Sequence, residues 1–407
     1  MVFTKTYTDG TTPTIAIIGA GISGLCAAVQ LQRQLNITSY QIFEMESDIG
    51  GTWYNNNYPG CACDNLSHLY HYSFAPNYEW TKRYASQEEI HAYLKSTART
   101  YNIYDKISFN KRINQMRWDQ EHSKWELQWE DLKSGAKGTF VAAVVFHGAG
   151  AFAKPKIPKE FSAFTGPKWH SAQWRRADDI TGKTVGIVGC SASAVQIITG
   201  ITNTVKTLHI YGRSPVHIVP SPNTPYSDFR RWLFRRVPLF HWLYCLLCYY
   251  AQDFTFPIYC KLTWYSLLHR TIATAFLRWN LYRQVPDPEL RKKLTPGRPL
   301  GSRRTVISTE YYTAVQQKNV AYHKAHIAEI QGTTITLEDG SKQHLDVLIM
   351  ATGFDMSLNF PVGFWTGRGD IDMATFWSQS AGTYFGACAP NAPNFYMGWG
   401  PRSGSRK

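Results

Sequence analysis

The sequence has few cysteines: eight in 407 residues, which is too few for a scaffold held together by disulfides. Two close pairs occur, Cys61 with Cys63 and Cys245 with Cys248, but neither is accompanied by a second pair or a histidine cluster at zinc-like spacing. We therefore expect free thiols in a reducing, cytoplasmic environment, and no metal site.

The sequence also lacks a long apolar run. Residues 1–13 are polar and have no apolar core of the kind that secretory signals carry. The longest uncharged run between residues 229 and 304, residues 237–252, has 16 residues, whereas a helix needs about 20 to cross a bilayer. Arginines precede this run and aromatic residues lie within it, so residues 229–260 could rest on a membrane surface. We favour the alternative, a buried or half-buried helical insert.

Acidic residues are scarce as well, since 29 Asp and Glu oppose 43 Lys and Arg and leave a formal charge of +14. The surplus is concentrated in residues 229–304, where 14 basic residues oppose three acidic ones. No aromatic and basic RNA or DNA motif accompanies this charge, so we expect no nucleic-acid partner. Hydrophobic residues make up 44% of the chain, which excludes intrinsic disorder and predicts a packed core.

A first nucleotide-binding pattern starts at the apolar run Ile15–Ile18, which predicts a strand. Gly19, Gly21 and Gly24 follow with the spacing GxGxxG and open an Ala- and Leu-rich helical pattern. These glycines permit a tight turn, close approach of the backbone to a pyrophosphate, and packing of the helix on the strand. Glu44 ends the next apolar stretch, 20 residues after the last glycine, where a carboxylate accepts hydrogen bonds from a ribose diol.

A second pattern begins with a predicted strand at residues 182–188 and turns through Gly189 into another helix. Ser191 and Ala194 replace the second and third glycines, so a phosphate there would approach small side chains instead of bare backbone. The following strand leads to Arg213 rather than to an acid, and an arginine there suits the 2′-phosphate of NADP. The alternative is an ordinary surface arginine before a turn proline.

Two such patterns predict two dinucleotides, and a flavin with the nicotinamide that reduces it is the natural pair. A third apolar strand, residues 345–350, is expected to return the chain to the first sheet. We therefore predict an α/β fold with two nested Rossmann-like dinucleotide-binding domains of the FAD/NAD(P)-binding type. The FAD-binding domain would comprise residues 1–150 and 330–407. The NADP-binding domain would comprise residues 151–329, with a helical insert at 226–300.

Three further blocks resemble the Baeyer–Villiger monooxygenases, a class B group within the flavin-containing monooxygenase superfamily. Residues 50–60 are very similar to the flavin loop of that family. Residues 164–174 match its fingerprint F-x-G-x-x-x-H-[S/T]-x-x-W, although Arg175 replaces the usual Pro or Asp. Residues 294–304 match a third block of the family. The resemblance extends from about Thr14 to Pro401 and so covers nearly the whole chain.

The resemblance implies that FAD and NADPH are the cofactors and that particular residues hold them. It implies FAD contacts for residues 52–55 and Tyr70, NADP contacts for Arg213, Ser214 and Arg303, and a catalytic pair formed by Asp64 and Arg304. The complete set of predicted cofactor-binding residues is Gly19, Gly21, Gly24, Glu44, Thr52, Trp53, Tyr54, Asn55, Ala62, Cys63, Asp64, Tyr70, Ile113, Gly189, Ser191, Ala192, Ser193, Ala194, Arg213, Ser214, Arg303 and Arg304.

The resemblance also implies a reaction, Baeyer–Villiger oxidation. One oxygen atom from O2 would be inserted next to a ketone carbonyl, through a C4a-peroxyflavin, to give an ester or lactone. Arg304 would stabilise the peroxide anion, because a guanidinium keeps its charge at any working pH, and Asp64 would hold that guanidinium. The alternatives are N- or S-oxygenation by the protonated hydroperoxide, which needs no such pair, and a truncated, catalytically silent flavoprotein homologue.

The insert and the C-terminus bear on the substrate and on activity. The aromatic residues between 229 and 282 suggest a roomy apolar site, so we expect a small-molecule ketone of secondary-metabolite biosynthesis. Relatives usually continue beyond the Gly400-Pro401 of this chain into a helix that packs under the isoalloxazine. We therefore expect a C-terminally short member of the family.

Overall fold

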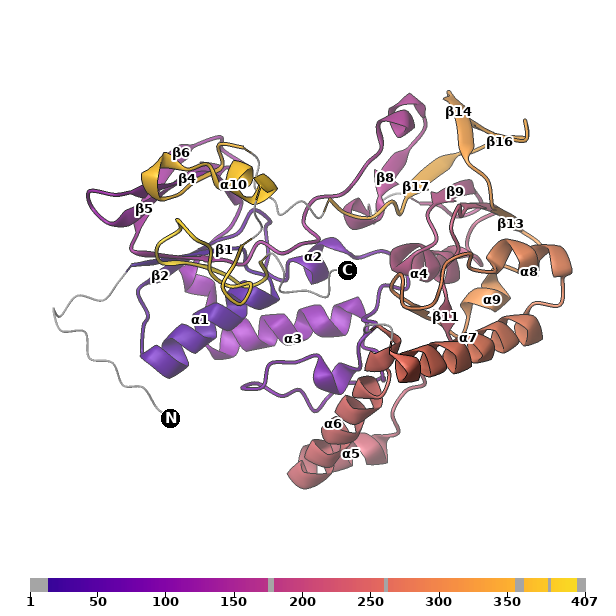
Figure 1. Ribbon diagram of the computed structural model, residues 1–407, viewed down its shortest axis with the longest axis horizontal. Coiled ribbons are helices and arrows are strands. Elements are labelled where there is room, and N and C mark those ends of the chain that lie inside the picture. Colours follow the sequence, from indigo (N-terminus) through magenta and orange to yellow (C-terminus); the bar gives the residue numbers. More distant parts are fainter. Residues whose placement is uncertain (1–13, 175–178, 260–262, 356–361, 380–381, 401–407) are drawn as a thin grey trace. The chain divides into compact units, whose positions relative to one another are not determined.

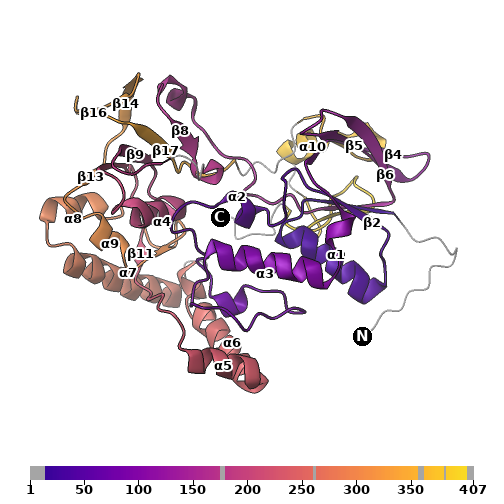
Figure 2. The same cartoon turned by 180° about the vertical axis from the view of Figure 1, so that it is seen from behind.

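The computed structural model describes residues 14–174, 179–259, 263–355, 362–379 and 382–400, and Arg175 of the fingerprint lies outside them. The chain divides into two compact units, whose elements are labelled in Figure 1 and seen from behind in Figure 2. Unit 1 comprises Met1–Asn55, Ile90–Lys156 and Phe354–Lys407, and unit 2 comprises Asn56–Glu89 and Ile157–Gly353.

The parallel sheet of unit 1 has the strand order β19-β7-β1-β2-β3. Its strands are β1 (Ile15–Ile18), β2 (Tyr40–Phe43), β3 (Ile107–Ser108), β7 (Val144–His147) and β19 (Phe395–Met397). Every residue of β1 is buried, as in a parallel sheet covered on both faces. Helix α1 (Ile22–Leu35) follows β1 after the glycine turn, which is the strand–turn–helix unit that the first glycine pattern predicts.

A second, mainly antiparallel sheet of unit 1 has the order β18-β4-β5-β6. Its strands are β4 (Lys111–Asp119), β5 (Lys124–Asp131), β6 (Lys137–Ala142) and β18 (Trp365–Thr366). Buried side chains of this sheet, such as Trp125 and Trp365, form one core cluster with Ile18 and Phe395 of the parallel sheet. The remaining elements of unit 1 are α2 (Thr52–Asn55), most of α3 (Gln87–Thr100), η2 (Tyr104–Lys106), η6 (Arg368–Asp370) and α10 (Met373–Gln379).

Unit 2 contains a second parallel sheet, with the strand order β13-β10-β9-β17-β8. Its strands are β8 (Lys168–His170), β9 (Thr184–Val188), β10 (Thr207–Tyr211), β13 (Val320–His323) and β17 (Val347–Met350). Helix α4 (Ala192–Ile201) follows β9, so the second predicted strand–turn–helix unit is present. The smaller elements are η1 (Ser67–Leu69), η3 (Lys159–Ala163), η4 (Ser171–Gln173), β11 (Ile218–Val219), β12 (Val306–Ile307), α9 (Tyr311–Ala314), β14 (Ile327–Gln331), β15 (Thr334–Leu337) and β16 (Lys342–His344).

The prediction that residues 345–350 return the chain to the first sheet is wrong. β17 pairs in parallel with β9 and β8 of the second sheet, and the first sheet receives β19 instead. All four residues of β17 are apolar and buried, so its sequence has no alternation that could distinguish one parallel sheet from another. Residues 330–353 consequently lie in unit 2 and not in the first domain, where we had placed them.

Residues 226–300 form the predicted helical insert, and its helices are half-buried, with both buried and exposed residues. The insert contains α5 (Asp228–Arg236), α6 (Pro238–Asp253), η5 (Phe256–Ile258), α7 (Trp264–Gln284) and α8 (Pro288–Leu294). Helix α5 packs against α6 (Figures 1 and 2). In α6 only His241 and Cys248 are buried, while Leu239 and Leu247 are 64% and 66% exposed. These side chains therefore do not form the apolar interior of a roomy site. Within the described ranges, no helix combines the length and apolarity needed to cross a bilayer.

Candidate dinucleotide sites and an arginine–aspartate pair

The first glycine turn is built so tightly that side chains would not fit at two of its positions. Gly19 has φ +93°, and a Cβ there would lie 2.9 Å from the carbonyl oxygen of Gly148. A Cβ on Gly24 would overlap the carbonyl oxygen of Gly19. Gly21 is the N-cap of α1 and provides no side-chain cap, and the N-terminus of a helix favours an anion. The turn therefore fits a pyrophosphate.

Glu44 follows β2 and lies beside this turn, with its side chain 6% exposed. Its Oε2 atom accepts a hydrogen bond from the Ala20 N–H at 2.6 Å, and its Oε1 atom accepts one from the Glu46 N–H at 2.9 Å. Burial raises the pKa of this carboxyl group, and the backbone N–H groups oppose that shift. A carboxylate fixed in this way can accept the hydroxyl groups of a ribose, so unit 1 fits the adenosine half of a flavin dinucleotide.

Four further predicted flavin residues form helix α2, and a fifth lies in the core. Helix α2 comprises Thr52–Asn55 and follows Gly50 and Gly51, both of which have positive φ. A Cβ on Gly51 would lie 3.1 Å from the Cα of Gly21, so this loop approaches the glycine turn closely. Ile113 in β4 is only 7% exposed and belongs to the main core cluster of unit 1. A cofactor contact of Ile113 stays a prediction.

The second turn requires glycine at its first position only. Gly189 has φ +127°, and a Cβ there would overlap the carbonyl oxygen of Ala351. Ser191 is the N-cap of α4 and makes no side-chain cap, Ala194 is buried against the sheet, and Ala192 and Ser193 are partly exposed. Small residues therefore replace the second and third glycines while the N-terminus of α4 stays open to an anion.

Two arginines lie close to this second turn. The Cys190 Sγ atom donates a hydrogen bond to the Ser214 carbonyl oxygen at 2.8 Å. Burial raises the pKa of the Cys190 thiol, and the positive charges of Arg303 and Arg213 lower it. Both guanidinium groups are thus near enough to act on the turn, and Arg213 is exposed. Unit 2 brings together the residues predicted to bind NADP.

Asp64 and Arg304 are separated by 240 positions in the sequence and form an ion pair in unit 2. The Arg304 Nη2 atom donates to the Asp64 Oδ1 atom at 2.6 Å. The Asp64 side chain is 24% exposed and the Arg304 side chain is 60% exposed. A guanidinium has five N–H donors, so Arg304 keeps donors for a ligand while Asp64 orients it. Cys63 beside this pair stays a thiol at neutral pH, because burial raises its pKa to about 12.

Close backbone packing holds the segment with Asp64 on α4. Tyr58 Oη donates to Gln196 Oε1 at 3.0 Å, and Gln196 Nε2 donates to the Ala62 carbonyl oxygen at 2.9 Å. Gly60 has φ +78°, and a Cβ there would lie 2.6 Å from the Gln196 carbonyl oxygen. This packing places residues 56–89 in unit 2 and not in the first domain, where we had placed them. The predicted cofactor-binding residues Ala62, Cys63, Asp64 and Tyr70 are therefore in unit 2.

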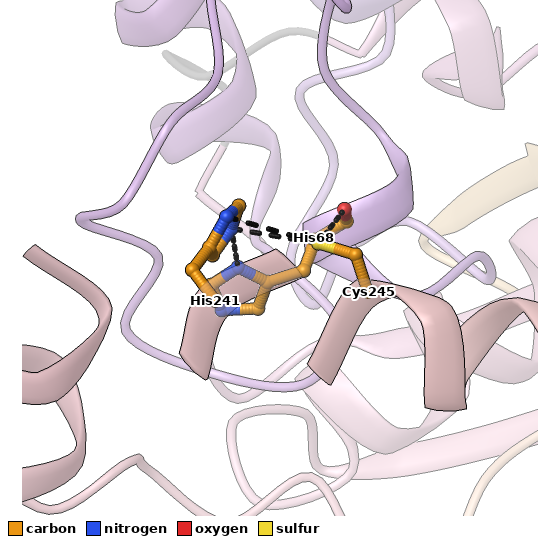
Figure 3. A group of neighbouring side chains, drawn as sticks. All are labelled: His68, His241 and Cys245. Carbon is orange, nitrogen blue, oxygen red and sulfur yellow. Dashed lines mark hydrogen bonds between the residues drawn. The ribbon is translucent and has the colours of Figure 1, made fainter. Parts of the chain in front are cut away.

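Sequence analysis missed a cluster formed by His68, His241 and Cys245, which Figure 3 shows. His68 lies in η1, 173 positions from His241 in α6, so no local spacing rule could pair them. Burial and the neighbouring imidazoles lower the pKa of His68 to about 3, and burial lowers the pKa of His241. The one sequence signal was the separation of four residues between His241 and Cys245, which places both on one face of a helix.

Comparison with known proteins agrees with this geometry. The profile of the flavin-binding monooxygenase-like family matches residues 12–221. The chain is 35% identical over 398 residues to a Baeyer–Villiger monooxygenase of Pseudomonas aeruginosa, which covers 96% of this chain and 72% of that protein. It is 34% identical over 395 residues to a Baeyer–Villiger monooxygenase of Streptomyces coelicolor, which covers 96% of this chain and 73% of that protein.

Solved structures show the same fold. The complex of OTEMO with FAD and NADP is 26% identical, with a TM-score of 0.82 over 97% of this chain and 81% of that chain. Cyclohexanone monooxygenase from Rhodococcus sp. Phi1 bound to NADP+ has a TM-score of 0.82 at 24% identity, over 95% of this chain and 80% of that chain. The predicted α/β fold of dinucleotide-binding domains is confirmed. The family profile matches more than half of the sequence, so the chain belongs to the flavin-binding monooxygenase-like family.

Proposed function

We propose that this protein is an FAD- and NADPH-dependent monooxygenase that carries out Baeyer–Villiger oxidation of a small-molecule ketone. The ketone, O2, NADPH and one proton give an ester or lactone, NADP+ and water. The two dinucleotide turns support the cofactors, and the relatives named Baeyer–Villiger monooxygenases support the reaction. Bound FAD would take the hydride of NADPH and activate O2.

The observation that carries the proposal is the ion pair of Asp64 with Arg304. Insertion of oxygen beside a carbonyl passes through negatively charged oxygen, which a fixed cation stabilises. A guanidinium is a permanent cation in proteins, and the exposed N–H groups of Arg304 can face the reacting atoms. Asp64 orients the guanidinium before the reaction starts, so little reorganisation is needed when charge develops. Oxygenation at nitrogen or sulfur does not require such a cation.

Substitution of Arg304 tests this role. We expect Arg304→Ala to keep NADPH oxidation but to reduce ester formation at least about 100-fold, because loss of one such donor costs about 3 kcal/mol of barrier. Ester yield per NADPH oxidised, measured by gas chromatography with a cyclic ketone, separates the two effects. Arg298→Ala is the matched control, since Arg298 is an exposed arginine of the same loop. If Arg304→Ala formed ester at the wild-type rate, Arg304 would have no role in the reaction.

A further inference from the structure

We infer that His68, His241 and Cys245 form a binding site for a zinc-class divalent cation. The three residues come from two elements of unit 2, η1 and α6 (Figure 3). One ligand atom of each residue lies within 4.8 Å of the corresponding atoms of the other two. This inference concerns residues outside the predicted cofactor and catalytic sets, so it does not depend on the proposed reaction.

Two of the three distances between the ligand atoms match the edges of a tetrahedral site, and the third is within 4.8 Å. His68 Nδ1 lies 3.1 Å from His241 Nε2, and Cys245 Sγ lies 3.5 Å from the same nitrogen. With metal–nitrogen and metal–sulfur bonds of about 2.0 and 2.3 Å, a zinc tetrahedron has edges of about 3.3 Å between nitrogens and about 3.5 Å between nitrogen and sulfur. A single ion can therefore contact His241 together with either neighbour, and contact with all three requires His68 and Cys245 to be held at a similar separation, within the 4.8 Å that they show.

The chemistry of the set favours zinc over harder cations. Imidazole nitrogen and thiolate sulfur suit Zn2+, whereas Mg2+ and Ca2+ require oxygen ligands. Binding would release one proton from the Cys245 thiol and replace the hydrogen bond between the imidazoles. Aromatic rings surround the histidines, with Phe234 4.3 Å from His68 and Tyr78 4.7 Å from His241 between ring centroids. His68 and His241 are 1% and 7% exposed, while Cys245 is partly exposed, so the histidines are enclosed by the protein and the site is reached from the side of Cys245.

Metal titration of the purified full-length protein tests the site. After treatment with a chelator, we expect equilibrium dialysis to show one tightly bound Zn2+, and Co2+ to give a thiolate charge-transfer band in the difference spectrum. Cys245→Ser and His241→Gln should each weaken metal affinity by at least about tenfold. Cys248→Ser is the matched control, because Cys248 is buried on the same helix but lies outside the cluster. The inference would be overturned if the protein bound no stoichiometric Zn2+, or if a folded Cys245→Ser variant bound Zn2+ as tightly as the wild type. His68 and His241 would then be only a hydrogen-bonded pair.

A different observation, the exposed apolar surface of the insert, carries a second inference. We propose that α6 and α7 rest on an anionic membrane surface. Leu239, Leu243, Leu247, Tyr250 and Phe254 recur at intervals of three or four residues along α6 and its C-cap, and each is 49% to 72% exposed. Such a stripe on one helical face costs free energy in water and is typical of interfacial helices.

Helix α7 carries a second stripe of the same kind, formed by exposed Trp264, Leu268, Ile272, Phe276 and Trp279. Tryptophan and tyrosine favour the boundary between lipid and water because their rings are apolar with one polar atom.

The positive charge of the insert indicates that the membrane surface is anionic. Residues 229–304 contain 14 basic and three acidic residues, and Arg230, Arg236, Arg278 and Arg283 are exposed. Basic side chains beside apolar stripes complement anionic lipid headgroups, whereas a protein partner would not require this excess.

Vesicle sedimentation tests this second inference. We expect the protein to sediment with vesicles of phosphatidylcholine and phosphatidylserine, and less with phosphatidylcholine alone or at high salt. The double variant Leu243→Ser and Leu247→Ser should bind at least about tenfold more weakly, because burial of each leucine side chain in the membrane favours binding. Leu132→Ser with Val141→Ser is the matched control, since both residues are exposed in unit 1. The second inference would be overturned if the protein did not bind vesicles. It would also be overturned if the protein formed a concentration-dependent oligomer in which these leucines are buried.

Discussion

Arg213 is the residue expected to distinguish NADPH from NADH. It is exposed after β10, and its charge acts on the turn at Cys190. An arginine at the end of this strand pairs with the 2′-phosphate that only NADPH carries. Its identity was readable from sequence, because Arg213 and no acid follows the predicted strand. The proximity of Arg303 to the turn at Cys190 spans 113 positions and became visible only in the structure.

We predict that Arg213→Ala lowers the preference for NADPH over NADH. A hydrogen bond to a charged group contributes about 1.5 to 3 kcal/mol, so the ratio of kcat/KM values should fall about 10- to 100-fold. Steady-state oxidation of both nucleotides provides the measurement, and the NADH values serve as the internal control because NADH lacks the phosphate. If the ratio of kcat/KM values did not change, Arg213 would be an ordinary surface arginine that does not contact the 2′-phosphate.

His147 is expected to make stability depend on pH. It ends β7, is 9% exposed and stacks on Phe395, with 6.1 Å between the ring centroids. Burial lowers its pKa to about 4, whereas an unfolded chain has a histidine pKa of about 6.5. The unfolded state therefore binds the proton first as the pH falls. The contribution of His147 to stability is fully present above pH 6.5 and is lost between about pH 6.5 and pH 4.

The variant His147→Asn isolates this contribution. Between pH 7 and pH 5 the free energy of unfolding of the wild type should fall by about 2 kcal/mol more than that of the variant. Urea unfolding followed by circular dichroism at both pH values gives the two differences. Equal differences in wild type and variant would show that His147 does not titrate in this range.

At the scale of elements, the strand–turn–helix units could be predicted and their assignment to sheets could not. Gly19 and Gly189 mark backbone positions with positive φ whose place in the turn follows from spacing. The strand β17 is apolar and buried throughout, so either sheet was compatible with its sequence. The packing of residues 58–62 on α4 involves hydrogen bonds over about 135 positions, which no local pattern encodes.

Gly60 tests this packing directly. We predict that Gly60→Ala destabilises the protein by about 2 kcal/mol, because its positive φ strains an alanine and the new Cβ would lie 2.6 Å from the Gln196 carbonyl oxygen. Chemical unfolding provides the measurement. Gly297→Ala is the control, since a Cβ there meets no atom within 4 Å. A variant as stable as the control would show that the segment with Asp64 can move away from α4.

At the scale of the whole molecule, composition predicted a packed core, and the concentration of the charge in the insert was visible in the sequence. The exposure of the insert was not, because an aromatic and leucine-rich segment reads as core until its neighbours are known. Asp64 and Arg304 were linked by family resemblance and lie in contact in the structure. Their part in catalysis belongs to the proposed function and is tested by the variant Arg304→Ala.

Oxygen-isotope labelling during ketone oxidation tests the central claim most directly. The full-length protein, supplied with FAD and NADPH, would be incubated with a cyclic ketone under 18O2, and the products analysed by mass spectrometry. The proposed function predicts a lactone that carries one 18O atom in its ring, formed with consumption of NADPH. Consumption of NADPH without any labelled lactone from a panel of ketones, or 18O transfer only to amines or sulfides, would contradict it.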